Sequence, residues 1–177
     1  QLVGLTVVLH GTPAIAYETL RYSWAWKHIG IVDFIQRHGS PDPDAAFLAV
    51  YHNWPGFFLV AAWLGDLFEL TPLALAELAR FFPTALNLAF LIVLPKIFRR
   101  FTTDARLVWT ATCLFLLGNW IGQDYFSPQG TAYLMYLGVL VLCLGPLARG
   151  PASWSSWIGP SPALAQFHSM VSRGLPS

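Results

Sequence analysis

Charged residues are scarce in this chain. They make up 11% of its 177 residues, whereas hydrophobic residues make up 55%. A soluble domain usually carries about 25% charged residues, so this composition predicts an integral membrane protein. Ten Lys and Arg stand against nine Asp and Glu. A chain without a basic excess offers no surface that holds nucleic acid through its phosphates, and no nucleic-acid partner is expected.

Cysteine is also nearly absent, and the sequence has no metal-binding motif. Cys113 and Cys143 both lie inside apolar runs, which excludes a disulfide framework and a thiolate metal cluster of ordinary spacing. The five histidines show no metal-ligand spacing, and neither a nucleophile elbow nor a phosphate-binding glycine loop is present. The apolar residues that follow Gln1 have no basic segment before them. We therefore expect a chain that begins within a helix and is a fragment of a longer protein.

Long apolar stretches predict an all-α membrane domain over residues 1–148 with about four transmembrane helices. A span needs about 20 mostly apolar residues to cross a hydrocarbon core of about 30 Å. The second stretch reaches this length only if Glu77 and Arg80 lie near an interface, where long side chains extend into the headgroups. The Pro- and Ser-rich residues 149–177 are predicted to form a loop or a disordered tail. The predicted spans are residues 2–16, 73–98, 107–123 and 129–147.

A long loop over residues 17–72 is predicted to lie on the outer face and to carry interfacial helices. Residues 22–38 have the apolar spacing of a surface helix. Residues 55–70 begin with a proline suited to a helix start, but a helix of this length covers only about 24 Å and falls short of a span. Treating it as a surface helix also places the basic connector over residues 96–106 in the cytoplasm, as the positive-inside rule requires.

Several polar residues of the outer loop are candidates for chemistry. Glu18 stands where the first span leaves the membrane, and a partly desolvated carboxylate there is a candidate general base; pairing with Arg21 one helical turn away is the alternative. Arg21, Lys27 and His28 are candidates to bind an anionic headgroup such as a lipid phosphate, against simple lipid attraction. His52 is a candidate to bind a phosphate or hold a carboxylate, against a solvated loop histidine.

The turn between the third and fourth spans is rich in amides and aromatic rings. Such groups bind sugars through apolar ring faces and directional hydrogen bonds, although aromatic residues also form belts at membrane interfaces. Gly118 and Gly122 form a GxxxG pattern, which predicts close packing with a partner helix. The sugar-binding candidates in this turn are Gln123, Asp124, Tyr125 and Gln129.

The order of these features resembles the amino-terminal part of the GT-C superfamily, whose members are membrane glycosyltransferases that use polyprenyl-phosphate sugars. Its members are similar in having a first span, an acidic residue in a long outer loop, and a proline-containing entry to a surface helix. A span that ends in basic residues follows. Here the corresponding features are Glu18, residues 51–55, the helix over 55–70, and Lys96 with Arg99 and Arg100.

This resemblance implies a mechanism and a location. Glu18 would deprotonate an acceptor hydroxyl, and Asp124 would bind the acceptor or a divalent cation. Arg21, Lys27 and His28 would stabilise the charge of the leaving phosphate. The donor would be a polyprenyl-phosphate sugar in the lipid bilayer, in the cytoplasmic membrane of a bacterium with the active face outside. The alternatives are a non-catalytic membrane module that packs with partner helices and a portion of a transporter. A truncated chain is expected to be inactive alone.

Overall fold

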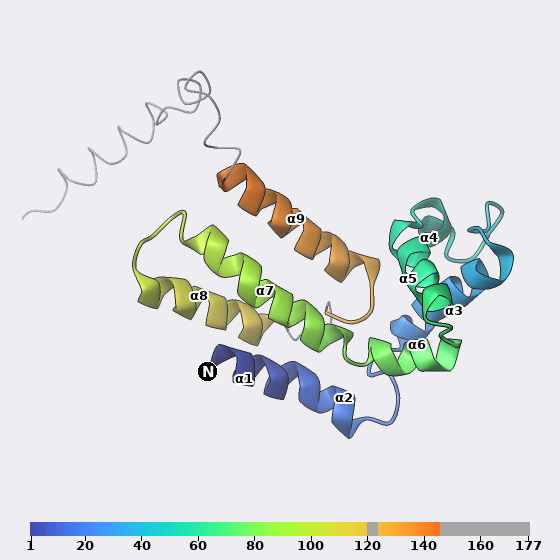
Figure 1. Ribbon diagram of the computed structural model, residues 1–177, viewed down its shortest axis with the longest axis horizontal. Helices are drawn as coiled ribbons and strands as arrows, with labels where there is room; N and C mark the ends of the chain where they lie inside the picture. Colours follow the sequence, from blue (N-terminus) through green and yellow to red (C-terminus); the bar gives the residue numbers. More distant parts are fainter. Residues whose placement is uncertain (120–123, 146–177) are drawn as a thin grey trace, which may run out of the picture. The chain divides into compact units, whose positions relative to one another are not determined.

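A computed structural model describes residues 1–119 and 124–145, and every regular element in these two stretches is a helix (Figure 1). The predicted all-α fold class is therefore confirmed. The chain divides into the units Gln1–Gly138 and Val139–Ser177. Of the second unit, the structure describes only the end of the last helix and Gly145. Gln123, Gly122 and the predicted tail over 149–177 lie outside the described residues.

The first helical segment matches the stretch predicted over residues 2–16 but contains a wide turn. It consists of α1 (Leu2–Thr6), the π-helical turn η1 (Val7–Gly11) and α2 (Thr12–Ala16). Pro13 follows this wide turn, and a proline has no N–H to donate to the carbonyl four residues before it while its ring crowds that carbonyl. This loss explains the local widening, and such π turns are frequent at functional sites.

The segment predicted as an outer loop, residues 17–72, contains three helices. The surface helix predicted over 22–38 is α3 (Ser23–His38), which ends at Gly39 with a φ of 74°, the left-handed conformation that glycine adopts at helix ends. The helix predicted over 55–70 is α5 (Gly56–Leu67). The short helix α4 (Ala49–Asn53) was not predicted. The boundaries of α3 and α5 agree with the predicted ones to within three residues.

The single helix expected over residues 73–98 is wrong, because the structure has two helices there. α6 (Pro72–Ala79) ends before Arg80, and α7 (Phe82–Phe98) begins two residues later. Pro83 lies in the first turn of α7, where a missing N–H costs nothing. The same proline cannot donate to the carbonyl of Ala79 and its ring would collide with it, so the helix stops.

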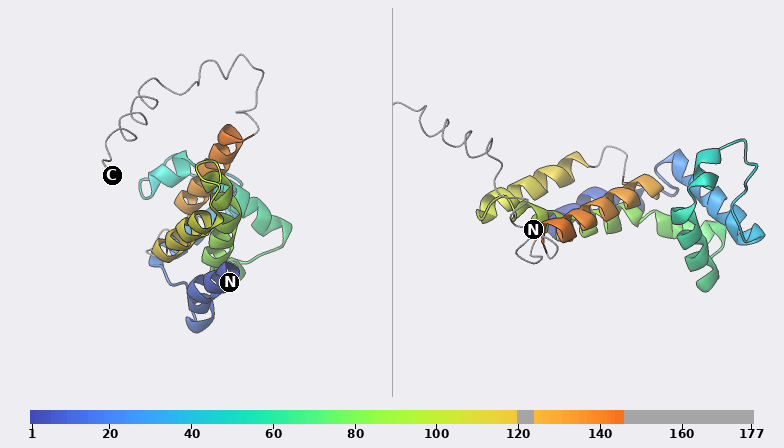
Figure 2. Two further views of the ribbon diagram at one scale, coloured as in Figure 1. Left: turned by 90° about the vertical axis from the view of Figure 1, so that its left-hand side faces the viewer. Right: turned by 90° about the horizontal axis from the view of Figure 1, so that it is seen from above.

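The remaining helices are α8 (Ala105–Gly118) and α9 (Pro128–Leu144). Asp104 caps the start of α8, its carboxylate accepting from the Arg106 N–H. The helix packs beside α7 (Figure 2). The Phe90 ring of α7 meets the Phe115 ring of α8 at 5.2 Å and the Tyr133 ring of α9 at 5.8 Å between centroids.

Within residues 1–119 and 124–145, no single helix is both long enough and apolar enough to cross a membrane. Among the described helices, α5 and α6 taken together satisfy both criteria, but the pair is bent by 114° at the break between them.

Helices α3 and α5 of the predicted outer loop share a hydrophobic core with α6. α3 packs against both α5 and α6, and Val32 of α3 and Phe58 of α5 are fully buried between them. Phe126, from the segment before α9, completes this core. The other buried members are Leu20, Ala25, Ile29, Ile31, Ile35, Ala61, Ala62, Leu75, Ala76 and Ala79.

Candidate functional site

Three buried polar side chains from distant parts of the chain meet at one point. His10 of η1, Asn87 of α7 and Asp124 of the turn before α9 are each at most 3% exposed. His10 Nδ1 lies 2.8 Å from Asp124 Oδ2, and Asn87 Nδ2 donates to the same oxygen at 3.1 Å. Buried polar groups of this kind are stable only when hydrogen-bonded. The cluster therefore fixes the turn at Asp124 against η1 and α7.

The hydrogen-bond network determines which nitrogen of His10 carries a hydrogen. Asn119 Nδ2 donates to Asn87 Oδ1 at 2.8 Å, which orients the Asn87 amide. Its two N–H hydrogens then go to the Pro83 carbonyl and to Asp124 Oδ2, so none is left for His10 Nδ1, 3.1 Å away. His10 Nδ1 is therefore assigned as the donor to Asp124, which leaves Nε2 as the acceptor nitrogen of the ring.

A small cavity lies against this cluster. Its volume is about 20 Å³, enough for one water molecule, which needs about 10–15 Å³. Two buried acceptor atoms, His10 Nε2 and Asp124 Oδ1, have no hydrogen-bond partner among the described residues. The residues that line the cavity thus include the two that carry these acceptor atoms and two arginines. Its lining residues are His10, Pro13, Ala14, Thr19, Arg21, Arg80, Pro83 and Asp124.

Arg80 closes one side of the cavity and joins α2 to the break between α6 and α7. Its guanidinium donates to the backbone carbonyls of Ala14 and Tyr17 and forms an ion pair with Glu77. Carbonyls at a helix C-terminus lack partners inside the helix and carry partial negative charge. A cationic side chain is therefore favoured at this position.

His28 anchors the turn at residues 124–127 to α3. The ring is fully buried, its Nδ1 donates to the Phe126 carbonyl at 2.8 Å, and it stacks on Tyr125 with centroids 5.6 Å apart. Burial lowers the pKa of His28 below 6.5, and the hydrogen bond to Phe126 offsets this only partly. Burial also raises the pKa of Tyr125, with a smaller contribution from Tyr51. His28 thus acts as a packed, neutral core group.

The lowered pKa of His28 predicts that stability falls in acid. The unfolded chain binds a proton at His28 more readily than the folded chain does, so this contribution is complete above about pH 6.5 and is lost as the pH falls through the folded-state pKa. We expect thermal unfolding in detergent, followed by circular dichroism, to shift to lower temperature from pH 7.5 to 5. His28→Asn retains an amide donor for the Phe126 carbonyl, and its shift should be smaller; an equal shift would contradict this assignment.

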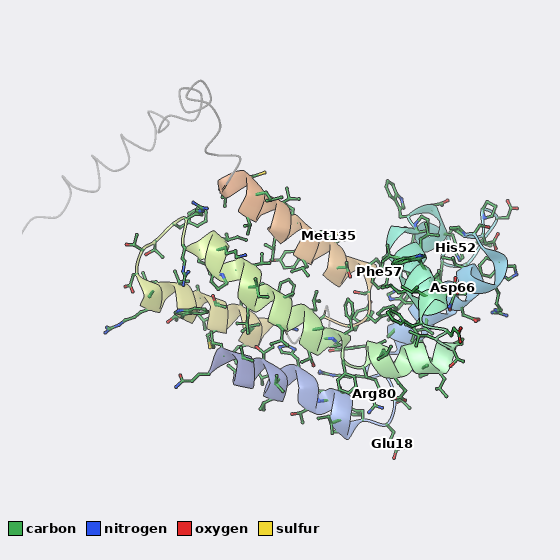
Figure 3. The ribbon with its side chains drawn as sticks, in the orientation of Figure 1. Glu18, His52, Phe57, Asp66, Arg80 and Met135 are labelled. Atoms are coloured by element: carbon green, nitrogen blue, oxygen red, sulfur yellow. The ribbon has the colours of Figure 1, made fainter. Side chains whose placement is uncertain are left out.

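The structure separates Glu18 from the cavity. Glu18 is exposed, it does not line the cavity that Thr19 and Arg21 line, and Figure 3 shows its side chain pointing away from the helices. Asp124 and Arg21, two of the predicted site residues, are brought together there. Of the two predicted carboxylates, only Asp124 therefore lies in a setting that a substrate group can share with cationic side chains.

The other predicted binding residues are dispersed. Lys27 is exposed, and its Nζ lies 3.6 Å from the Trp24 ring centroid, whereas the neighbouring His28 is buried. His52, among the outer helices in Figure 3, accepts from the Asp42 N–H at 3.0 Å. These three side chains therefore do not form a common anion site with Arg21. Gln123 lies outside the described residues.

Gln129 and Gly118 are the remaining predicted residues that the structure describes, and they differ in their surroundings. Gln129 is exposed and lines a cavity of about 420 Å³ together with Asn119 and Tyr133.

A Cβ added at Gly118 would meet nothing within 4 Å. That side of α8 is open to a partner helix, and the GxxxG contact stays a prediction because Gly122 is outside the described residues.

Sequence reasoning missed His10 and Asn87. Both interrupt otherwise apolar helices, and ionisable or strongly polar residues in such helices mark functional sites. Pro13, three residues after His10, was a second signal, because it predicts a distorted turn. What no local pattern showed is that Asp124, 114 residues away from His10, forms the third member of the cluster.

Comparison with known proteins gives no relative. In the described part of the chain, no three His, Cys, Asp or Glu side chains converge as metal ligands. No protein-family model, curated protein or solved structure matches the chain.

Proposed function

We propose that this chain is the amino-terminal part of a GT-C-type membrane glycosyltransferase that moves a sugar from a polyprenyl phosphate to an acceptor on the outer face. The observation that carries the proposal is the cavity at which Asp124, Arg21 and Arg80 meet. A carboxylate and two guanidinium groups suit a reaction in which a hydroxyl loses a proton and a phosphate leaves with negative charge.

Exposed apolar side chains support the membrane location. Ile92 of α7, Leu114 of α8 and Met135 of α9 are 62%, 65% and 66% exposed. Soluble monomers rarely leave extended apolar areas open to water, and no charged residue lies in α9. These helices are suited to contact lipid, and the polyprenyl tail of the donor requires a site at this level.

The position of the outer helices supports a single active face. α6 adjoins the start of α7, and the connector rich in Lys and Arg follows the end of α7 (Figure 1). The positive-inside rule places that connector in the cytoplasm, and hence α3, α5 and α6 on the other side. The turn at residues 124–127 contacts α3 through the His28 hydrogen bond. Both polar outer segments then face one compartment.

The cationic groups proposed to stabilise the phosphate differ from those that the sequence predicted. Arg21 and Arg80 line the cavity, and we assign to them the stabilisation of the departing phosphate. Lys27 and His28 are engaged elsewhere, Lys27 with the Trp24 ring and His28 with the Phe126 carbonyl. We assign Asp124 rather than Glu18 to the centre of the site.

Replacing Asp124 by Asn tests the proposal. In the complete protein reconstituted in membranes, transfer of a labelled sugar from a polyprenyl phosphate should fall by about 10²–10³-fold, the loss typical of a preorganised polar group in an active site. Asn preserves the size of the side chain and one acceptor oxygen. Glu18→Gln is the matched control, because it removes the other outer carboxylate. Equal transfer rates for wild type and Asp124→Asn would refute the assignment.

A further inference from the structure

We propose that His10 is the general base of this site, with Asp124 as its positioning residue. This inference rests on the proposed glycosyl transfer and adds a residue that the sequence pattern does not single out. His10 is 3% exposed, lines the cavity, and has an Nε2 atom without a partner among the described residues.

The geometry prepares His10 Nε2 to accept a proton. Its Nδ1 donates to Asp124 Oδ2 at 2.8 Å, and the same oxygen is held by the Asn87 amide. A carboxylate on Nδ1–H fixes the ring orientation and stabilises the imidazolium that forms when Nε2 takes a proton, the arrangement found where a histidine acts as a base. The π turn η1 carries this residue on a helix whose backbone is locally widened.

The volume of the cavity is suited to a single hydroxyl group. At about 20 Å³, it holds a group of the size of a water molecule, which is also the size of a hydroxyl. A sugar ring does not fit. The acceptor hydroxyl therefore enters beside His10 Nε2, while the rest of the acceptor and the donor sugar lie outside, toward Thr19 and Arg21 at the cavity wall.

The step balances without a further reactant. The acceptor hydroxyl gives its proton to His10 Nε2, and its oxygen forms a bond to the anomeric carbon of the donor sugar. The bond between that carbon and the phosphate oxygen breaks, and the phosphate keeps the electron pair. Asp124 offsets the new positive charge of the imidazolium, and the guanidinium groups of Arg21 and Arg80 offset the negative charge of the leaving phosphate. Water then removes the proton from Nε2 before the next turnover.

His10→Asn tests this role in the complete protein. The Asn amide nitrogen occupies about the position of Nδ1, so it retains the donor to Asp124 and removes Nε2. We expect unchanged thermal unfolding, sugar transfer slower by about 10²–10⁴-fold, and loss of the acid limb of the pH profile that the wild type shows when Nε2 is protonated. A merely structural histidine would leave that limb in place.

A second variant distinguishes loss of the base from misfolding of the protein. His10→Ala should be as slow as His10→Asn, and added imidazole should restore part of its activity by supplying a base in the emptied space. If the wild-type protein transfers sugar and the His10→Asn rate is within threefold of the wild-type rate, the inference about His10 is overturned. The proposed function is not affected by that result. Absence of sugar transfer by the wild-type protein from polyprenyl-phosphate sugars would overturn both.

Discussion

Replacing Phe58 by Ala is expected to lower the free energy of unfolding by about 3–5 kcal/mol, the cost typical of emptying a buried aromatic site. Phe58 is 0% exposed and is surrounded by rings: its centroid lies 5.5 Å from those of His28 and Tyr51 and 5.3 Å from that of Phe57. Such contacts add to the loss of buried area. The measurement is denaturant unfolding in detergent micelles, followed by circular dichroism.

An exposed phenylalanine provides the control. Phe101, in the connector after α7, is 74% exposed, and Phe101→Ala should change the free energy of unfolding by no more than about 0.5 kcal/mol. Similar destabilisation by both substitutions would show that the core of α3, α5 and α6 does not hold the outer helices together as the structure indicates.

Replacing Arg80 by Ala is expected to destabilise the fold by about 2–3 kcal/mol, because charged donors contribute more than neutral ones to a hydrogen bond. The side chain is 16% exposed and bonds the carbonyls of Ala14 and Tyr17, which no other described group bonds. Its removal leaves the C-terminus of α2 without a cation and separates it from the α6–α7 break. Denaturant unfolding measures this loss as well.

Glu77→Gln separates the backbone bonds of Arg80 from its ion pair. Glu77 is 55% exposed, and exposed ion pairs contribute about 0–1 kcal/mol. Glu77→Gln should therefore be nearly neutral. If Glu77→Gln and Arg80→Ala had equal effects, the ion pair rather than the contact with α2 would be the stabilising interaction.

The sequence predicted elements with strong local patterns. The apolar spacing of residues 22–38 identified α3 because burial follows the helical period: His28, Ile31, Val32 and Ile35 are all buried. Trp24, in the first turn of α3, is 44% exposed, and the Lys27 ammonium lies over its ring.

The break within residues 73–98 shows where pattern reading failed. Hydrophobicity continues across the junction, so composition alone gives one long helix. Pro83 carried the contrary signal, because a proline interrupts the bond to the residue four positions before it. The prediction of one helix gave more weight to the continuous apolar run than to the steric effect of a single proline.

The site was predictable only in part. Asp124 and Arg21 were identified from their types and their places near the membrane, and the structure brings them together. His10 and Asn87 join them through tertiary contacts over 114 and 37 residues, which no window of sequence contains. Glu18 follows the first helical segment, as expected for the predicted base. The direction of its side chain depends on the backbone conformation after α2, and the position of a residue in the sequence does not specify that conformation.

The common orientation of the two outer segments is the central claim, and cysteine labelling tests it most directly. In the complete protein carrying Cys113→Ala and Cys143→Ala, single cysteines replace the exposed residues Glu18, Gln129 and Thr103. A membrane-impermeant maleimide applied to intact cells should label positions 18 and 129, and position 103 only after permeabilisation. Labelling of positions 18 and 129 from opposite sides of the membrane would contradict the account.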